Sequence, residues 1–188
     1  GEQGARLESE CLEIAHQTNL RLIGPNCIGL IDYHLPLDTS FVTLPPPPKG
    51  DLALISQSGA VCGVIMDWAR EQGIGFARML SLGNQADVTE TDMLPGIAGD
   101  EKTRVITFYM ESIRDGRRFV DEAGKAARRK PLIAMKVGRS LSGQRAAASH
   151  TGALAGVEQA YEAGFRRAGV LQAGSIEEMF DWAVALAD

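Results

Sequence analysis

An unbroken apolar run, Leu52-Ala53-Leu54-Ile55, constrains the fold of this chain more than any other feature. A strand that is apolar on both sides is typical of the interior of a parallel sheet, where helices cover both faces. A helical pattern starts at Ser58 and ends near Gly73, and its apolar stripe consists of Val61, Val64, Ile65 and Trp68. We therefore predict a buried strand followed by an amphipathic helix.

The same alternation continues along the chain. Further strands are predicted near residues 76–82, 104–110, 131–137 and 169–172, and helices near 89–99, 116–129, 151–168 and 175–187. The last helix has a predicted capping box formed by Ser175 and Glu178, ahead of the stripe Ile176, Met179, Phe180 and Ala183. Five strands that alternate with helices predict an α/β fold, a doubly wound parallel sheet of the flavodoxin-like class.

Two less regular segments precede this pattern. Residues 1–32 predict a helix with Leu7, Cys11, Ile14 and Ala15 on one face, a short strand at 21–23 and a turn at 24–26. Because a lone helix and strand cannot bury their apolar faces, we expect the rest of this βα unit upstream. Residues 33–50 contain four consecutive prolines and predict a linker or a segment along the sheet edge, which leaves residues 51–188 as the main domain.

Composition excludes several functions. Lys and Arg number 19 against 24 Asp and Glu, a net charge of −5, so no basic field is present to hold nucleic acid or an anionic membrane. No apolar run approaches the roughly 20 residues of a membrane-spanning helix. Cys11, Cys27 and Cys62 are scattered, which favours neither a disulfide framework nor a metal site and fits a reducing cytoplasm.

In doubly wound sheets ligands bind beyond the carboxyl ends of the strands, so the loops there are the candidate sites. Ser56-Gln57-Ser58-Gly59-Ala60 joins the buried strand to its helix, where small residues and the positive helix end favour an anion. The simpler alternative is that Ser58 only caps the helix and Gly59 only permits close packing.

His150 ends a small, polar loop that follows the Gly- and Ser-rich run 138–144. Neutral imidazole is a nucleophile near its reference pKa of about 6.5, and the flanking glycines predict that residues 138–149 move. Glu111 directly follows a strand and is able to orient an imidazole, although a solvated or helix-capping glutamate fits the spacing equally well. Cys27, beside the turn, is expected to be a small buried hydrophobe.

The chain resembles the alpha subunit of succinyl-CoA synthetase and, more closely, the NDP-forming acyl-CoA synthetases of the ADP-forming acetyl-CoA synthetase type. The resemblance is carried by four segments, in chain order Gly24-Pro25-Asn26-Cys27, Ser56-Gln57-Ser58-Gly59, Tyr109-Met110-Glu111 and Ser149-His150-Thr151-Gly152-Ala153. The resemblance covers nearly the whole chain. It implies that residues 1–32 are the remnant of a CoA-binding Rossmann domain and that His150 carries a phosphoryl group, with Glu111 as its acidic partner. It also implies a phosphate cradle and a CoA or acyl site. The cradle comprises Ser56, Gln57, Ser58, Gly59, Ala60, Thr151 and Gly152, and the CoA or acyl site comprises Asn26, Cys27, Gly83 and Asn84.

The resemblance further implies a mechanism with partners. Acyl phosphate, formed or consumed beside coenzyme A, exchanges its phosphoryl group with His150, which delivers it to a nucleotide on an ATP-grasp module. That module, in a separate subunit or the same polypeptide, would bind ATP or ADP (or GTP or GDP) with Mg outside this chain. A carboxylic acid substrate and an oligomer are implied, and the isolated chain should be inactive.

Two alternatives remain open from the sequence. One is the synthetase-like regulatory region of a protein lysine acetyltransferase. The other is a flavodoxin-like binding module without chemistry, such as a receiver or a flavin protein. A receiver needs clustered acidic residues after its first strand, which Ser56-Gln57-Ser58 does not offer. For a flavin protein the relevant residues are Trp68 and Trp182, which have the spacing of helical core residues and do not lie in loops.

Overall fold

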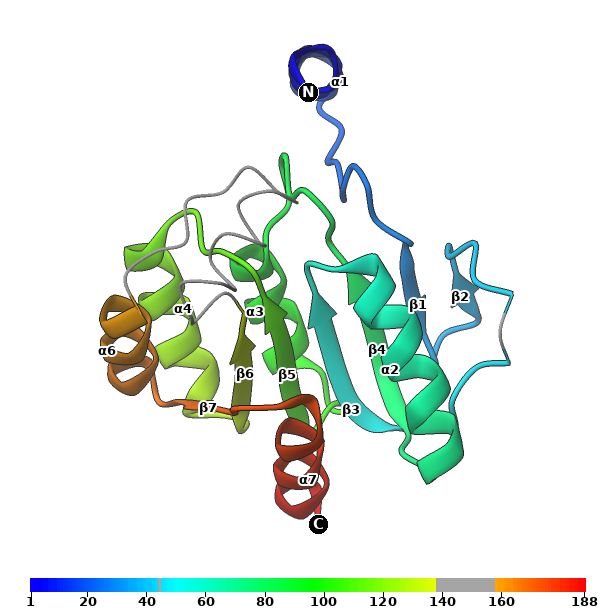
Figure 1. Ribbon diagram of the computed structural model, residues 1–188, viewed down its shortest axis with the longest axis vertical. Coiled ribbons are helices and arrows are strands. Elements are labelled where there is room, and N and C mark those ends of the chain that lie inside the picture. Colours follow the sequence, from blue (N-terminus) through cyan, green and yellow to red (C-terminus); the bar gives the residue numbers. More distant parts are fainter. Residues whose placement is uncertain (44, 138–157) are drawn as a thin grey trace.

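The computed structural model describes residues 1–43, 45–137 and 158–188, which form one sheet of seven strands flanked by helices (Figure 1). The strand order is β2-β1-β4-β3-β5-β6-β7. In chain order the strands are β1 (Leu30–Asp32), β2 (Leu37–Asp38), β3 (Lys49–Ser56), β4 (Phe76–Ser81), β5 (Val105–Met110), β6 (Leu132–Lys136) and β7 (Val170–Gln172).

The parallel core confirms the predicted fold class. Strands β4, β3, β5, β6 and β7 are parallel neighbours, and numbered among themselves they have the flavodoxin-like order 2-1-3-4-5. They coincide with the five predicted strands. The two further strands, β1 and β2, were not predicted. Both are antiparallel and extend the sheet beyond β4. Strand β2, at the sheet edge, lies within residues 33–50, which we predicted as a linker or a segment along the sheet edge.

Helices cover both faces of the core. Leu54 of β3 packs in one apolar cluster with α2 (Gly59–Gln72) and α7 (Ile176–Ala187). Its neighbours Ala53 and Ile55 pack in a second cluster with α3 (Glu90–Gly99), α4 (Gly116–Ala127) and α6 (Glu158–Ala168). Alternate residues of β3 therefore enter opposite layers, which explains why the whole run is apolar.

The ends of α2 agree with the sequence, but its buried face differs slightly. The Ser58 Oγ accepts a hydrogen bond from the Val61 N–H at 3.3 Å, and Gly73 ends the helix with a φ of 69°. The buried residues are Cys62, Ile65, Met66 and Ala69. Val64 is 64% exposed, so its inclusion in the core stripe was wrong. The helix has more apolar residues than its contact face accommodates.

The predicted capping box of α7 is half right. The Ser175 Oγ accepts from the Glu178 N–H at 3.1 Å, as expected. The Glu178 carboxylate accepts from the Gly174 N–H at 2.6 Å, one residue before the cap that we predicted as its partner. Trp68 and Trp182 pack against the core cluster of this face, which confirms their interpretation as core residues, and the Trp68 ring lies 5.4 Å from that of Phe180.

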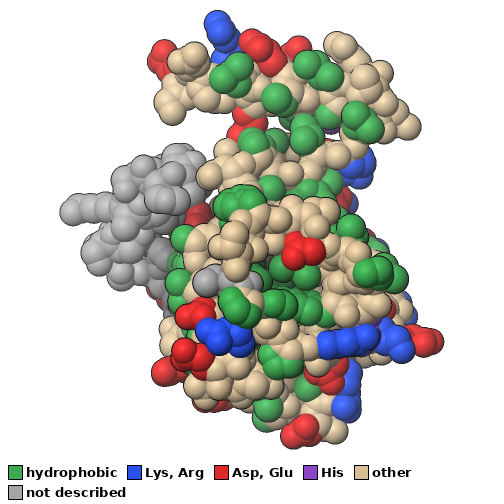
Figure 2. All heavy atoms as spheres, turned by 90° about the vertical axis from the view of Figure 1, so that its right-hand side faces the viewer, with side chains coloured by type: hydrophobic (Ala, Val, Ile, Leu, Met, Phe, Trp, Pro, Cys, Tyr) green, Lys and Arg blue, Asp and Glu red, His purple; other side chains and the backbone are tan. Residues whose placement is uncertain are grey.

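The N-terminal helix α1 (Glu2–Gln17) stands apart from the sheet (Figure 1). Of its residues only Ala15 is buried, while Leu7 and Ile14 are 49% and 59% exposed. Figure 2 shows hydrophobic side chains on this helix, at the top of the view. The apolar face of α1 is thus largely uncovered within the described residues. No helix in the described ranges has the length and apolarity needed to cross a membrane.

The strand predicted at residues 21–23 does not form. Leu22 instead exchanges hydrogen bonds with a loop, because its N–H donates to the Asp87 carboxylate at 2.8 Å and its C=O accepts from the Val88 N–H at 3.0 Å. Arg21 pairs with the same carboxylate at 2.9 Å. This segment therefore runs beside the loop that follows β4, outside any strand.

Candidate functional site at the carboxyl edge of the sheet

The candidate site lies where the strand order reverses, between β3 and β5. The connections leave these adjacent strands in opposite directions, and the loops after them flank the crevice where such folds bind ligands. The loop after β3 is Ser56–Ala60, and the loop after β5 starts at Glu111. The Gln57 N–H donates to the Tyr109 C=O at 3.1 Å, so the two predicted segments lie side by side.

The start of α2 presents backbone donors at this edge. The Ser56 Oγ, which is buried, donates to the Ser58 C=O at 2.8 Å and accepts from the Ser58 N–H at 3.1 Å. The Ser58 N–H is therefore already used. The N–H groups of Gly59 and Ala60 have no partner among the described residues, and they lie at the positive end of the helix.

Glycine at position 59 also has a packing reason. A Cβ there would lie 2.9 Å from the Cγ2 of Ile28, so a larger residue would push the two segments apart. The simpler interpretation of Ser58 and Gly59, capping and close packing, is thus correct for both. This interpretation is compatible with an anion site formed by the N–H groups of Gly59 and Ala60.

The side chain of Gln57 is fully engaged with protein groups. Its Oε1 accepts from the N–H groups of Glu111 and Ser112 at 2.7 and 2.9 Å. Its Nε2 donates to the Ser112 C=O at 2.7 Å and to the Glu90 carboxylate at 3.3 Å. A glutamine amide has two donors and two acceptor lone pairs, and all four are used. Gln57, predicted from the resemblance as a phosphate ligand, therefore ties the two loops together.

Glu111 is half-buried at the end of β5 and lies near a buried cation. Burial lowers the pKa of Lys136, while the negative charges of Glu111 and Glu158 act to raise it. The Lys136 Nζ donates to the Val137 C=O at 2.5 Å and lies 4.6 Å from the centre of the Tyr161 ring. Burial, with a smaller effect of the Glu111 charge, raises the pKa of Tyr109. A carboxylate and an ammonium group thus share this edge.

Two residues of the site were missed by the sequence analysis. Lys136 ends an apolar strand, a position where one charged residue has no distinctive pattern. Glu90, only 1% exposed, begins α3, where an acidic residue is ordinarily a solvated partner of the helix dipole. Its carboxylate accepts from the side chains of Gln85 at 2.8 Å and Thr91 at 3.1 Å, besides Gln57. Burial raises the pKa of Glu90, and these hydrogen bonds act in the opposite direction.

The residues predicted for a CoA or acyl site also come together, in a second pair of loops. The Asn84 N–H donates to the Pro25 C=O at 2.9 Å, and the Asn26 amide donates to the Asn84 side chain at 3.3 Å. Cys27 is half-buried, with its Sγ 3.6 Å from the Ile23 oxygen. Gly83 has a φ of 54°, and a Cβ there would lie 2.2 Å from the Pro25 oxygen. The close contact of these loops requires glycine.

The remaining predicted site residues are His150, Thr151 and Gly152, and they lie outside the described residues. Within residues 1–43, 45–137 and 158–188, no three His, Cys, Asp or Glu side chains are grouped closely enough to hold a metal ion. The three cysteines are free thiols, and burial raises the pKa of Cys62 to about 12.

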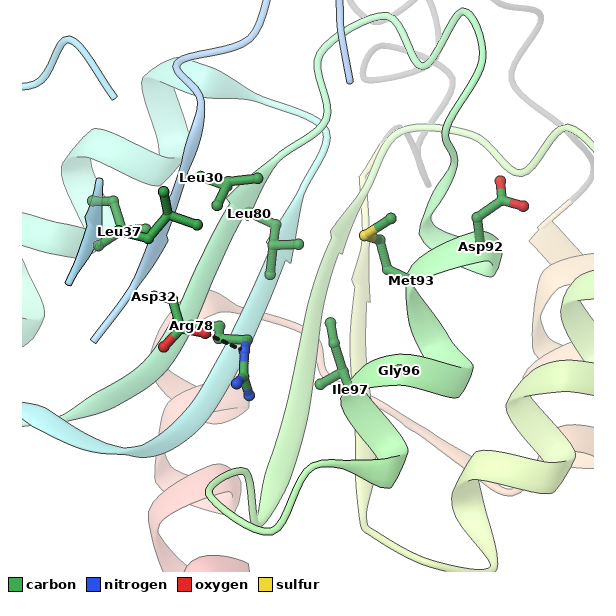
Figure 3. A pocket seen from close by; sticks show the side chains of 10 residues that line it. Leu30, Asp32, Leu37, Arg78, Leu80, Asp92, Met93, Gly96 and Ile97 are labelled. Carbon is green, nitrogen blue, oxygen red and sulfur yellow. Dashed lines mark ion pairs between the residues drawn. The ribbon is translucent and has the colours of Figure 1, made fainter. Parts of the chain in front are cut away.

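A pocket of about 270 Å³ lies elsewhere, between β1, β4 and α3 (Figure 3). Its wall is mainly apolar, with Leu30, Leu80 and Met93 among the lining residues, and Arg78 pairs with Asp32 at one end at 2.7 Å. None of the predicted site residues lines it. The candidate site is therefore the carboxyl edge of the sheet and not this pocket.

A parallel core in the order 2-1-3-4-5, with loops of polar and small residues at its switch point, defines a flavodoxin-like α/β domain. Residues 49–186 match the family described as the succinyl-CoA ligase like flavodoxin domain, and the chain belongs to this family. The family assignment confirms the resemblance found in the sequence.

Three similar proteins extend this comparison. An ADP-forming acetate–CoA ligase I of Archaeoglobus fulgidus is 46% identical over 186 residues, which cover 99% of this chain and 27% of the relative. The alpha subunit of an ADP-forming acetate–CoA ligase II of Pyrococcus furiosus is 46% identical over 185 residues, 98% of this chain and 40% of the subunit.

The third is a solved structure, the dinucleotide forming acetyl-coenzyme A synthetase 1 of Ca. Korarchaeum cryptofilum in complex with phosphate and ADP. It superimposes with a TM-score of 0.91 at 40% identity and covers 97% of this chain and 39% of that one. The chain thus spans between about a quarter and two fifths of the length of these proteins.

Proposed function

We propose that this chain is the phosphoryl-carrying domain of an NDP-forming acyl-CoA synthetase, an acid–thiol ligase, with His150 as the carrier. The observation that carries the proposal is the juxtaposition, at the switch point, of Glu111 with the donor-bearing start of α2. The Gln57 backbone joins the two loops directly, at 3.1 Å from its N–H to the Tyr109 oxygen. The names of the relatives, ADP-forming acetate–CoA ligases, support the reaction class.

The proposed chemistry assigns a role to each group. A neutral nitrogen of the His150 imidazole attacks the phosphorus of an acyl phosphate, and the bond between phosphorus and the carboxylate oxygen breaks. The second attack, by the diphosphate nucleotide on phosphohistidine, restores the imidazole. Glu111 accepts a hydrogen bond from the other ring nitrogen and balances the positive charge that develops on the ring. The N–H groups of Gly59 and Ala60 stabilise the phosphoryl oxygens.

The complete reaction needs groups beyond this chain. We propose that coenzyme A binds beside Asn26, Cys27, Gly83 and Asn84, and that the nucleotide, with Mg, binds an ATP-grasp module. The relatives are much longer than this chain, and one is named as an alpha subunit, which supports a further module or subunit. An oligomer and a cytoplasmic location belong to the same proposal.

The decisive experiment replaces His150 in the complete protein. Asparagine resembles histidine in shape but cannot accept a phosphoryl group, so His150→Asn should abolish acid-labile, base-stable labelling from γ-labelled nucleotide and stop CoA-dependent turnover. Glu111→Gln should retain some labelling and slow the transfer, because an amide still contacts the ring without balancing its charge. Full turnover in His150→Asn would refute the proposal in favour of a regulatory region or a binding module.

A second experiment tests the anion site with inorganic phosphate. Ser58→Ala removes the cap of α2 and Ser175→Ala removes the equivalent cap of α7, so each should cost about 1 kcal/mol of stability. Only Ser58→Ala should weaken phosphate binding measured by calorimetry, because only that cap orders the donors of the site. Equal phosphate affinity in both variants would argue against binding at Gly59 and Ala60.

A further inference from the structure

The position of Glu111 depends on a side chain from another loop. Strand β5 ends at Met110, so the sheet ladder no longer fixes the backbone at Glu111 and Ser112. Their two N–H groups donate to one atom, the Oε1 of Gln57, at 2.7 and 2.9 Å. The course of the Glu111 loop is therefore set by where the Gln57 amide lies and which way it faces.

The orientation of that amide needs an acceptor outside the loop. A flipped amide would place its NH₂ group against the N–H groups of Glu111 and Ser112, where it finds no acceptor. In the observed orientation the NH₂ group has two acceptors. One of these acceptors is the Ser112 C=O, which belongs to the loop being positioned and cannot anchor it. The other is the Glu90 carboxylate on α3, at 3.3 Å. Glu90 is thus the anchor that belongs to the rigid part of the domain.

Glu90 is itself fixed by donors. Its carboxylate accepts from the Gln85 amide at 2.8 Å and from the Thr91 hydroxyl at 3.1 Å, and it lies at the first position of α3, where the helix dipole favours a negative charge. A carboxylate that is only 1% exposed is a poor source of stability compared with an apolar residue of the same volume. Its arrangement suits a role in specifying geometry.

We propose that Glu90 is a positioning residue for phosphoryl transfer: it orients Gln57, and Gln57 holds Glu111 in place. This inference rests on the proposed function, in which Glu111 orients and balances the imidazole. Supporting residues of this kind typically change activity by about 10- to 100-fold when they are replaced. A displacement of about 1 Å at a reacting group has an effect of similar size.

The test uses Glu90→Gln in the complete protein, because glutamine keeps the shape, removes the negative charge and replaces one of the two carboxylate acceptors by an amide donor. The rate of histidine labelling in a single turnover should fall about 10- to 100-fold while the KM for CoA stays unchanged. Leu94→Ala is the matched control for the relay from Glu90 through Gln57 to Glu111, since Leu94 is a fully buried residue of the same helix whose apolar side chain takes no part in these hydrogen bonds. It should lower the melting temperature and leave the labelling rate within about twofold.

A double-mutant cycle identifies the route of the effect. In the Glu111→Gln background, Glu90→Gln should cause no further loss, because the group that it positions is already altered. If the two losses multiply, Glu90 acts independently of Glu111 and the proposal is wrong. A Glu90→Gln variant with the normal labelling rate overturns it as well.

Amide exchange tests the relay separately from the chemistry. Glu90→Gln should speed exchange at Glu111 and Ser112, the two N–H groups held by Gln57, and leave strand β5 protected. Unchanged exchange at these residues would overturn the relay whatever the activity. If exchange accelerates but His150→Asn still turns over, the relay stands as a structural feature and the proposed function is the part that fails.

Discussion

Replacing Gly83 by alanine tests how tightly the loop after β4 is held against residues 24–27. An alanine Cβ would lie 2.2 Å from the Pro25 oxygen and 2.4 Å from the Asn26 oxygen, so the loops must separate by about 1 Å to reach ordinary contact. The φ of 54° adds a cost of its own, because left-handed backbone disfavours L-residues by about 1–2 kcal/mol.

Gly73 offers a matched control for the backbone term. It also has a positive φ, 69°, but a Cβ there would meet nothing within 4 Å. Gly73→Ala should therefore cost about 1–2 kcal/mol, and Gly83→Ala an additional 1–3 kcal/mol or so from overpacking. The reduced entropy of the unfolded chain is common to both variants and cancels in the difference.

The assay is denaturant unfolding of the 188-residue chain and of both variants. At about 2–4 °C per kcal/mol for a chain of this size, the difference is also visible in melting temperature. In the complete protein Gly83→Ala should weaken CoA binding and Gly73→Ala should not, if the two loops form the CoA or acyl site. Equal destabilisation by the two substitutions would refute the clash, and with it the close contact between the loops.

The Asp100 carboxylate and the thiols of Cys11 and Cys62 allow two further tests of the structure. Burial alone would raise the pKa of Asp100, but hydrogen bonds from Arg78 and Thr103 lower it to about 2, below its usual 3.8. The ionised carboxylate therefore stabilises the folded state by about 2 kcal/mol above pH 4, and this contribution is lost as the pH falls toward 2. Asp100→Asn should flatten the dependence of the unfolding free energy on pH in that window, and an unchanged dependence in this variant would contradict the assignment. Alkylation followed by mass spectrometry should modify the exposed Cys11 rapidly and the buried Cys62 only on unfolding, since the thiolate is the reactive form; early labelling of Cys62 would contradict its burial.

The core of the fold was predictable because it rests on local patterns. The run from Leu52 to Ile55 is apolar at every position, and α2 begins and ends with residues whose roles are fixed by local geometry, Ser58 and Gly73. Strands β1 and β2 were not predicted because they are only three and two residues long, too short to show the alternating pattern of a strand. Val64 escaped because its exposure depends on how a helix rotates against a sheet.

The candidate site was predictable only in part. Position after a strand pointed to Glu111 and to the start of α2, since the topology brings these loops together. The function of Gln57 was not visible, because its partners lie 33 and 55 residues away and are defined by tertiary structure. Glu90 was missed for the same reason. Its type and place are those of an ordinary acidic residue at a helix start, and only burial distinguishes it.

The antiparallel strands β1 and β2 have a consequence for how the protein avoids self-association. Unpaired edges of long apolar strands are templates for aggregation. Strand β4, with five of its six residues buried, would be such an edge, but β1 pairs with it from Leu30 to Asp32. The strands left at the two edges are β2 and β7, only two and three residues long. A recombinant fragment that starts at Lys49, where the family match begins, would uncover β4, and we expect it to associate through that strand at concentrations at which the longer chain stays dispersed.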